Sequence, residues 1–337
     1  MKKLITQLLS LVILVALVVT IVPSSVPAQA PKAKPGTLSF ATLPMGGTYY
    51  LMSAAIAQVI EKYTEMKVTV EPSTGPLVYT PRIQSGDVDL AIINARDTYE
   101  TWTGTGDYAK IGKTDIALLG YGLGSRFVFF TRPDSGIKSI QDLAGKRVMY
   151  KTPGVPIAAE GAELVLNYYG LLKKIKELPG GRTTAKAQAL IEKRTDAYWC
   201  PVGTHIRNLT SSIGVVVLDV AEECSNAINK KYPWWVSAYV YKGEFGLKED
   251  HRLINVINDF YCRRALSEDT VYDIMKAVYE HPNDLKAIHR MAGTWTLKMA
   301  VRTQQVIPFH PGAIKYYKEK GLWTDQLEAK QKELLSK

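Results

Sequence analysis

The segment "LSFATLPMGGTYYLMSAAIAQVIEKY" (residues 38–63) decides the fold of this chain. It begins with a pattern typical of a strand, breaks at Gly46 and Gly47, and continues with helical periodicity. A helix that begins after a strand offers free N–H groups and the positive end of its dipole. The two glycines let a ligand approach the backbone closely, and Thr48 can cap the helix or donate a hydroxyl. We therefore expect a small anionic group to bind at this turn.

The alternation of strand and helix continues along the chain. Strands are predicted over residues 37–42, 67–73, 88–94, 115–122, 126–132, 146–150 and 256–264, and helices over 49–63, 77–85, 157–172 and 269–281. Such alternation favours an α/β fold with a largely parallel sheet.

The turn at Pro153 and Gly154 repeats the opening arrangement of strand, turn and helix. This repetition indicates a second α/β unit inserted into the first. We expect a first lobe made of residues 38–131 plus 251–337 and a second lobe made of residues 132–250. The two chain crossings would form a two-strand hinge beside a ligand cleft.

The first thirty residues have the layout of a secretory signal peptide. Lys2 and Lys3 precede a long apolar run, and small residues follow, with Ala28 as the favoured cleavage point. The run is also close to the ~20 residues that span a bilayer, so an uncleaved N-terminal anchor is the alternative. Residues 31–37 form a linker, and we expect the rest of the chain in the periplasm or another extracytoplasmic space.

The charge and the cysteines narrow the class of protein. Loss of the leader lowers the formal net charge from +10 to +8, and the lysines are scattered, so we expect a solvated basic surface and no nucleic-acid partner.

The three cysteines are Cys200, Cys224 and Cys262. Export permits a disulfide between the first two, but three unpaired thiols are equally open.

Motifs of known enzyme classes are missing from the sequence. There is no GxSxG or HExxH, "LAGKRV" lacks the glycine and the Ser/Thr of a P-loop, and the five histidines lack metal-ligand spacing. We therefore expect that the protein is not an enzyme and that it binds neither a metal ion nor a cofactor.

Five segments occur in an order that resembles one family. They are "GGTYY" (46–50), "QSGDVDLAIINARDTYE" (84–100), "DSGIKSIQDLAGKRV" (134–148), "TPG" (152–154) and "HPGAIKYYKEKGLW" (310–323). With the leader, they resemble the TAXI family of solute-binding proteins, the extracytoplasmic receptors of one class of TRAP transporters. The resemblance implies a type II periplasmic-binding-protein fold, a monomer, and delivery of a solute to the small and large subunits of an ion-driven permease.

The turns, the resemblance and side-chain chemistry together give the residues expected to hold the solute: the resemblance implies the turn residues and Asn94, whereas Arg96 is expected from its charge and the tryptophans as aromatic walls. In the first lobe these are Gly46, Gly47, Thr48, Tyr49, Thr74, Gly75, Tyr79, Asn94 and Arg96. In the second lobe they are Pro153, Gly154, Val155, Trp199 and Trp234.

Several of these positions depart from the family pattern, because apolar or aromatic groups replace hydroxyls and an amide. Since an unpaired buried polar group costs ~1–3 kcal/mol, we expect a carboxylate with an apolar or aromatic body. Arg96 follows a strand end and is the first choice to bind the carboxylate, with Arg82 and Arg126 as alternatives.

Two other functions stay open at this point. One is an exported sensor or ligand-dependent partner protein on the same fold, and the other is an exported enzyme on a two-lobe scaffold. Recovery of the ligand unchanged would separate a receptor from an enzyme.

Overall fold

The computed structural model describes residues 36–337, apart from 46–47, 154, 290–291 and 293–294. The leader, the anchor alternative and most of the linker lie outside the described residues, as do Gly46, Gly47 and Gly154 of the expected site. Within the described part of the chain, no helix is both long enough and apolar enough to cross a membrane.

The sheet runs in the order β2–β1–β3–β10–β4–β7–β5–β6. Its first strands are β1 (Thr37–Thr42), β2 (Lys67–Pro72) and β3 (Leu90–Asn94), and β1 pairs in parallel with both of the others. All five residues of β3 are buried, which explains why "LAIIN" shows no polar alternation.

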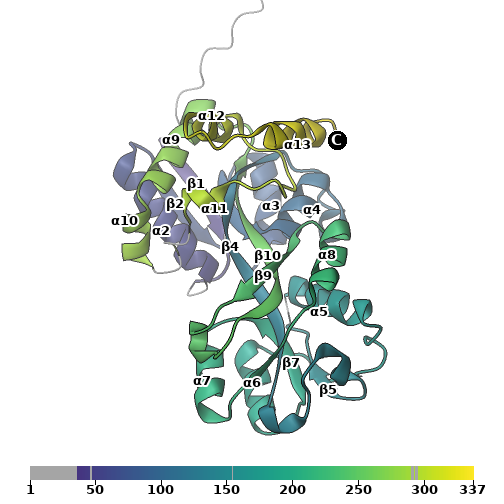
Figure 1. Ribbon diagram of the computed structural model, residues 1–337. Coiled ribbons are helices and arrows are strands. Elements are labelled where there is room, and N and C mark those ends of the chain that lie inside the picture. The colour runs from purple at the N-terminus through teal and green to yellow at the C-terminus, as the bar shows by residue number, and fades with distance from the viewer. Residues whose placement is uncertain (1–35, 46–47, 154, 290–291, 293–294) are drawn as a thin grey trace, which may run out of the picture. The chain divides into compact units, whose positions relative to one another are not determined.

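Two long antiparallel strands, β4 (Ile116–Thr131) and β10 (His251–Arg263), run through both halves of the structure (Figure 1). One end of β10 pairs with β3. The last residues of β4 pair with β7 (Ala197–Pro201) and β8 (Val216–Leu218), and the first residues of β10 pair with β9 (Trp235–Val240). The chain therefore passes between the lobes in paired strands.

The expectation of two strands over 115–122 and 126–132 is wrong, because β4 is continuous between them. The glycine-rich segment "GYGLGS" (residues 120–125) favours a break in the strand when the sequence is considered alone. In the structure these glycines allow close packing instead. A Cβ at Gly124 would lie 1.9 Å from the carbonyl oxygen of Val256, so only glycine lets β10 approach β4 there.

The first lobe covers β1, β2 and β3 with helices. Early in the chain these are α2 (Thr48–Tyr63), α3 (Pro76–Ser85) and α4 (Ala95–Thr103). After β10 come α9 (Glu268–Glu280), α10 (Pro282–Ile288), α11 (Leu297–Ala300), α12 (Pro311–Glu319) and α13 (Asp325–Leu335). Helix α2 buries Met52, Ile56, Val59 and Ile60, so its apolar face has the spacing expected from the sequence.

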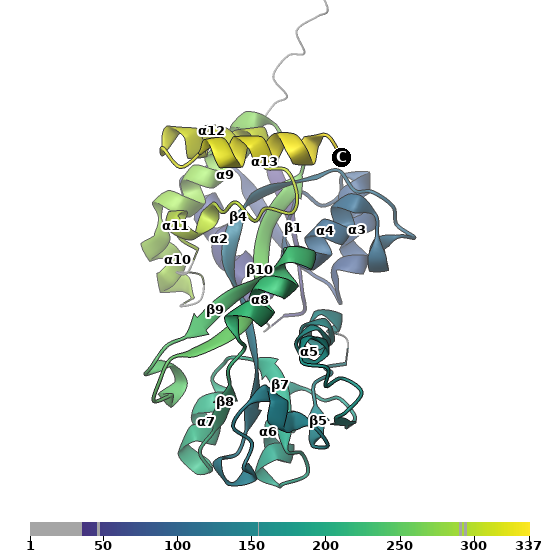
Figure 2. The same ribbon diagram turned by 45° about the vertical axis from the view of Figure 1, so that its right-hand side comes forward.

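The second lobe contains β5 (Arg147–Met149) and β6 (Lys176–Glu177) beside β7, with α5 (Pro156–Tyr168), α6 (Thr183–Ile191) and α7 (His205–Ser212) around them. Helix α8 (Glu222–Lys231) packs against β9 and α5 (Figure 2). The predicted two-lobe α/β fold is thus confirmed. The predicted lobe boundaries stay a prediction; Thr131 ends β4 and His251 begins β10.

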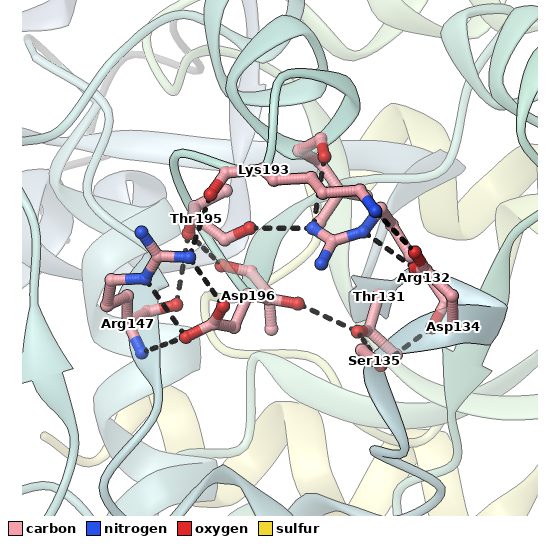
Figure 3. A network of polar contacts seen from close by, with 10 residues as sticks. Thr131, Arg132, Asp134, Ser135, Arg147, Lys193, Thr195 and Asp196 are labelled. Atoms are coloured by element: carbon pink, nitrogen blue, oxygen red, sulfur yellow. Dashed lines mark hydrogen bonds and ion pairs between the residues drawn. The ribbon is translucent and has the colours of Figure 1, made fainter.

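A polar network ties together the amino ends of β5 and β7 (Figure 3). Nη2 of Arg147 lies 2.8 Å from Oδ1 of Asp196, and the Arg147 backbone N–H donates to the other carboxylate oxygen. The Thr131 hydroxyl donates to the Asp196 carbonyl at 2.7 Å, and Arg132 donates to the Thr195 carbonyl at 3.1 Å. With their amino ends fixed here, both strands point their carboxyl ends toward the other lobe.

Candidate functional site

A cavity of about 1030 Å³ lies between the two lobes. Its walls come from the start of α2, the middle of β4 and β10, the turn between β7 and α7, and the loop after β9. Two of these walls, the start of α2 and the turn between β7 and α7, lie where a helix begins after a strand, as ligand sites do in open α/β sheets.

The first-lobe wall is formed by the first turn of α2. Thr48 is exposed, and Tyr49 and Met52 follow it along the cavity. The Tyr49 hydroxyl donates to Oδ1 of Asn258 on β10 at 2.8 Å. Burial raises the pKa of Tyr49, and the nearby Asp97 and Asp259 raise it further, so the phenol is neutral. This wall offers hydroxyls and an amide beside an apolar side chain.

The second-lobe wall is the "PVGT" turn that leads into α7. Pro201, Val202, Gly203 and Thr204 line the cavity, and Arg207 does so from the first turn of α7. Among the described residues no carboxylate pairs with Arg207, which is exposed. A cation and the start of a helix therefore face the same space.

A second arginine in the wall, Arg126 on β4, is already paired. Its Nη2 lies 2.8 Å from Oε2 of Glu244, and its Nη1 donates to Oε1 at 3.1 Å and to the Tyr239 carbonyl at 2.9 Å. These bonds lower the pKa of Glu244, so the carboxylate is ionised and balances the charge of Arg126. Arg207 is thus the cavity arginine with unbalanced charge among the described residues.

Asn94 and Arg96, expected at the site, do not line this cavity. Asn94 caps α4, since its Oδ1 accepts from the Asp97 backbone N–H at 3.1 Å. Arg96 pairs with Glu100 at 3.0 Å, with Asp107 at 3.3 Å and with Glu160 at 3.7 Å. Carboxylates therefore surround this guanidinium.

The other expected residues also lie away from the cavity wall. Tyr79 is buried in the first-lobe core, and Thr74 and Gly75 lie at the start of α3. Pro153 and Val155 are exposed before α5. Trp199 is fully buried, with ring centroids 4.7 Å from Phe129 and 5.8 Å from Phe127, and Trp234 packs 5.6 Å from Tyr99. Of the expected residues that the structure describes, the cavity brings together Thr48 and Tyr49, and Arg126, an alternative carboxylate partner, also lines it.

Several cavity residues were missed in the sequence. The turn at Gly203 and Thr204 follows a strand and precedes a helix, so the pattern that identified Thr48 could have found it. Arg207 and Asn258 carry no such signal, because one looks like any surface arginine and the other lies in an apolar strand. Cys200, Cys224 and Cys262 are buried free thiols, so no disulfide joins them in this structure.

Comparison with known proteins supports this arrangement of two lobes around a cavity. The sequence pattern of the NMT1-like family matches residues 40–321. The chain belongs to the NMT1-like family. The match spans nearly all of the described residues and includes elements of both lobes, so the family assignment covers the cavity and its walls.

Solved structures similar to this NMT1-like protein include periplasmic binding proteins. A sulfonate-binding SsuA from Methylobacillus flagellatus KT is 14% identical, over 85% of this chain and 95% of that one, with a TM-score of 0.51. A TctC solute-binding protein from Polaromonas is 14% identical, over 76% and 86%, with a TM-score of 0.53. PhnD1 from Prochlorococcus marinus, solved with methylphosphonate, is 12% identical, over 86% and 100%, with a TM-score of 0.53. At these identities the likeness establishes the fold.

Proposed function

We propose that this protein is an extracytoplasmic solute-binding receptor that captures a small organic anion in the interlobe cavity and delivers it to a membrane transporter. The observation that carries the proposal is the unpaired Arg207 on the wall of a cavity between two lobes. The NMT1-like family and the periplasmic-binding-protein fold support it.

The anionic group of the solute binds at the second-lobe wall. Arginine grips a carboxylate through two parallel hydrogen bonds, and Arg207 is free to do so. The backbone N–H groups at Gly203 and Thr204 add the positive end of α7. From the first lobe, the Thr48 hydroxyl and the start of α2 reach the same cavity. Binding of this kind needs no covalent chemistry.

The body of the solute lies against apolar side chains. Met52, Val202 and Phe245 line the cavity, and its volume of about 1030 Å³ exceeds what a short dicarboxylate fills. These features favour a carboxylate with an apolar or aromatic body. Sulfonates and phosphonates present a similar anionic group and are the competing solutes.

The transporter partner in this proposal is a TRAP permease with a small and a large membrane subunit. Five segments in the order of the TAXI family support that choice, and the N-terminal leader supports export. The protein acts as a monomer and returns its solute unchanged.

Thermal unfolding of the purified protein against a panel of organic acids tests the proposal. The panel includes phenylacetate, malate, glutamate, methanesulfonate and methylphosphonate. A bound solute stabilises the folded protein by RT ln(1 + [L]/Kd), ~2.7 kcal/mol at a hundredfold excess over Kd. A shift with one acid class, and recovery of that acid unchanged by mass spectrometry, supports a receptor. Conversion of the acid indicates an enzyme, and no shift with any anion contradicts the proposal.

A further inference from the structure

Lys186 on α6 is fully buried in the second lobe. Its ammonium donates to Oγ1 of Thr152 at 2.9 Å and to the Trp199 carbonyl at 2.7 Å. The described residues place no carboxylate within ion-pairing distance of this nitrogen. A buried ammonium without a counter-charge is unfavourable, so its presence in a well-packed lobe needs an explanation.

The titratable groups that face Lys186 do not balance its charge. They are Cys200 at the end of β7 and His205 at the start of α7, whose Sγ and Nε2 lie 3.2 Å apart. Burial raises the pKa of Cys200 to about 12 and lowers the pKa of His205 to about 4, so both are neutral near pH 7. Burial lowers the pKa of Lys186 to about 8, which leaves it mostly protonated.

This ammonium lies at the carboxyl edge of the second-lobe sheet. Strands β5 and β7 are parallel, with Met149 opposite Tyr198. Thr152 follows the carboxyl end of β5, and Pro201, which ends the neighbouring strand β7, lines the cavity. Because Oγ1 of Thr152 accepts from Lys186, its own hydroxyl hydrogen is left to donate elsewhere. Thr152 is only half-buried, so it is partly open to solvent.

We propose that Lys186 and Thr152 form a second anion-binding element of the interlobe site, in which Thr152 donates to the solute and Lys186 is the positioning residue behind it. The solute supplies the negative charge that is missing among the described residues around Lys186. This inference rests on the proposed receptor function and extends it, because it assigns the second lobe a buried positive charge besides the exposed Arg207.

Lys186→Met tests this inference, with Lys138→Met as a matched control. Both variants remove one lysine charge from the second lobe, but Lys138 is exposed. The probe is whichever of phenylacetate, malate and methylphosphonate binds the wild type most tightly, measured by calorimetry. We expect K186M to weaken binding about tenfold or more, as for a lost charge-assisted hydrogen bond, and K138M to leave it unchanged. The melting temperature of ligand-free K186M should not fall, whereas a merely structural lysine would lower it.

Thr152→Val and the pH profile of the wild type give two further tests. T152V should also weaken binding, and the double variant should lose little more, because the two residues act together. Bound anion raises the Lys186 pKa, so wild-type affinity should fall as the pH rises above about 8, and K186M should lack this step.

The outcomes distinguish failure of the proposed receptor function from failure of the role assigned to Lys186 and Thr152. If the wild type binds none of the acids in the panel used to test the proposed function, the proposed function and this inference both fail. If the wild type binds a probe and K186M binds it as tightly with the same pH profile, only the inference fails. If K186M does not fold, the wild-type profile and T152V decide: no decrease above about pH 8 and no loss in T152V overturn it.

Discussion

Nε of Arg96 lies 3.7 Å from Oε2 of Glu160, and this contact joins α4 of the first lobe to α5 of the second. The same carboxylate accepts a hydrogen bond from Nε1 of Trp235 at 3.4 Å. Glu100 and Asp107 pair with the other side of the guanidinium. Arg96 therefore connects the lobes and sits among three carboxylates, which disfavours a further anion.

Arg96→Gln should lower stability and leave acid binding nearly unchanged. Loss of the charge-assisted hydrogen bonds costs about 1–3 kcal/mol and leaves three carboxylates without their shared cation. Urea unfolding and calorimetry with the best-binding acid measure the two effects. Arg82→Gln is the control, because Arg82 is 44% exposed and, among the described carboxylates, pairs with Glu71 alone. A large loss of affinity in R96Q would instead support Arg96 as the carboxylate partner expected from the sequence.

Arg207→Gln should weaken acid binding about tenfold or more, since a hydrogen bond to a charged group contributes ~1.5–3 kcal/mol. Its melting temperature should stay close to that of the wild type, because the side chain is exposed and pairs with none of the described carboxylates. Arg194→Gln, which removes an exposed second-lobe arginine paired with Glu192, controls for net charge. Equal losses in both variants would point to a general charge effect and would contradict the assigned role.

Asp259→Asn should stabilise the protein at neutral pH but not in acid. Asp259 is fully buried, and neither carboxyl oxygen has a hydrogen-bond partner among the described residues. Burial raises its pKa well above the ordinary value. The folded protein thus keeps a proton that the unfolded chain loses above about pH 3.9, and stability falls as the pH rises from there. Urea unfolding of both proteins should show a higher free energy of unfolding for D259N, and the difference should grow with pH. A difference that does not change with pH would contradict this prediction.

Gly124→Ala should destabilise the protein by about 1–3 kcal/mol or more, the range for forced overpacking, because the new methyl group would meet the Val256 carbonyl. It should also weaken acid binding, since Gly124 lies in the cavity wall. Gly36→Ala is the matched control, because nothing lies within 4 Å of a Cβ there. If G124A melts and binds like the wild type, β4 and β10 are less tightly coupled than the structure indicates.

The order of strands and helices could be predicted because each element carries its own periodicity. The helix expected over 49–63 begins at Thr48, and the first strand is found at Thr37–Thr42 as expected. The continuity of β4 could not be predicted, because a glycine that permits close strand contact and a glycine that breaks a strand look alike in sequence.

The site was harder to predict because it depends on contacts between distant segments. Thr48 was found from its local turn. Arg207 was missed, since what distinguishes it from other arginines is the absence of a carboxylate partner in the fold. Arg96 was preferred for its position after a strand, but the three acids around it come from α4, the next loop and α5. The ion-pair partners of an arginine and the burial of Lys186 both depend on the fold, so neither can be predicted from the local sequence.

The pairing of β3 with β10 has a consequence for biogenesis. Leu90–Asn94 is made early in synthesis, but its neighbour in the sheet, residues 258–262, is made near the end. During synthesis the first lobe therefore has an open sheet edge until residues 258–262 have been made. The second lobe is nearly continuous in sequence and can fold while the first lobe is still incomplete. Truncation after the second lobe should accordingly leave an aggregation-prone fragment rather than a folded first lobe.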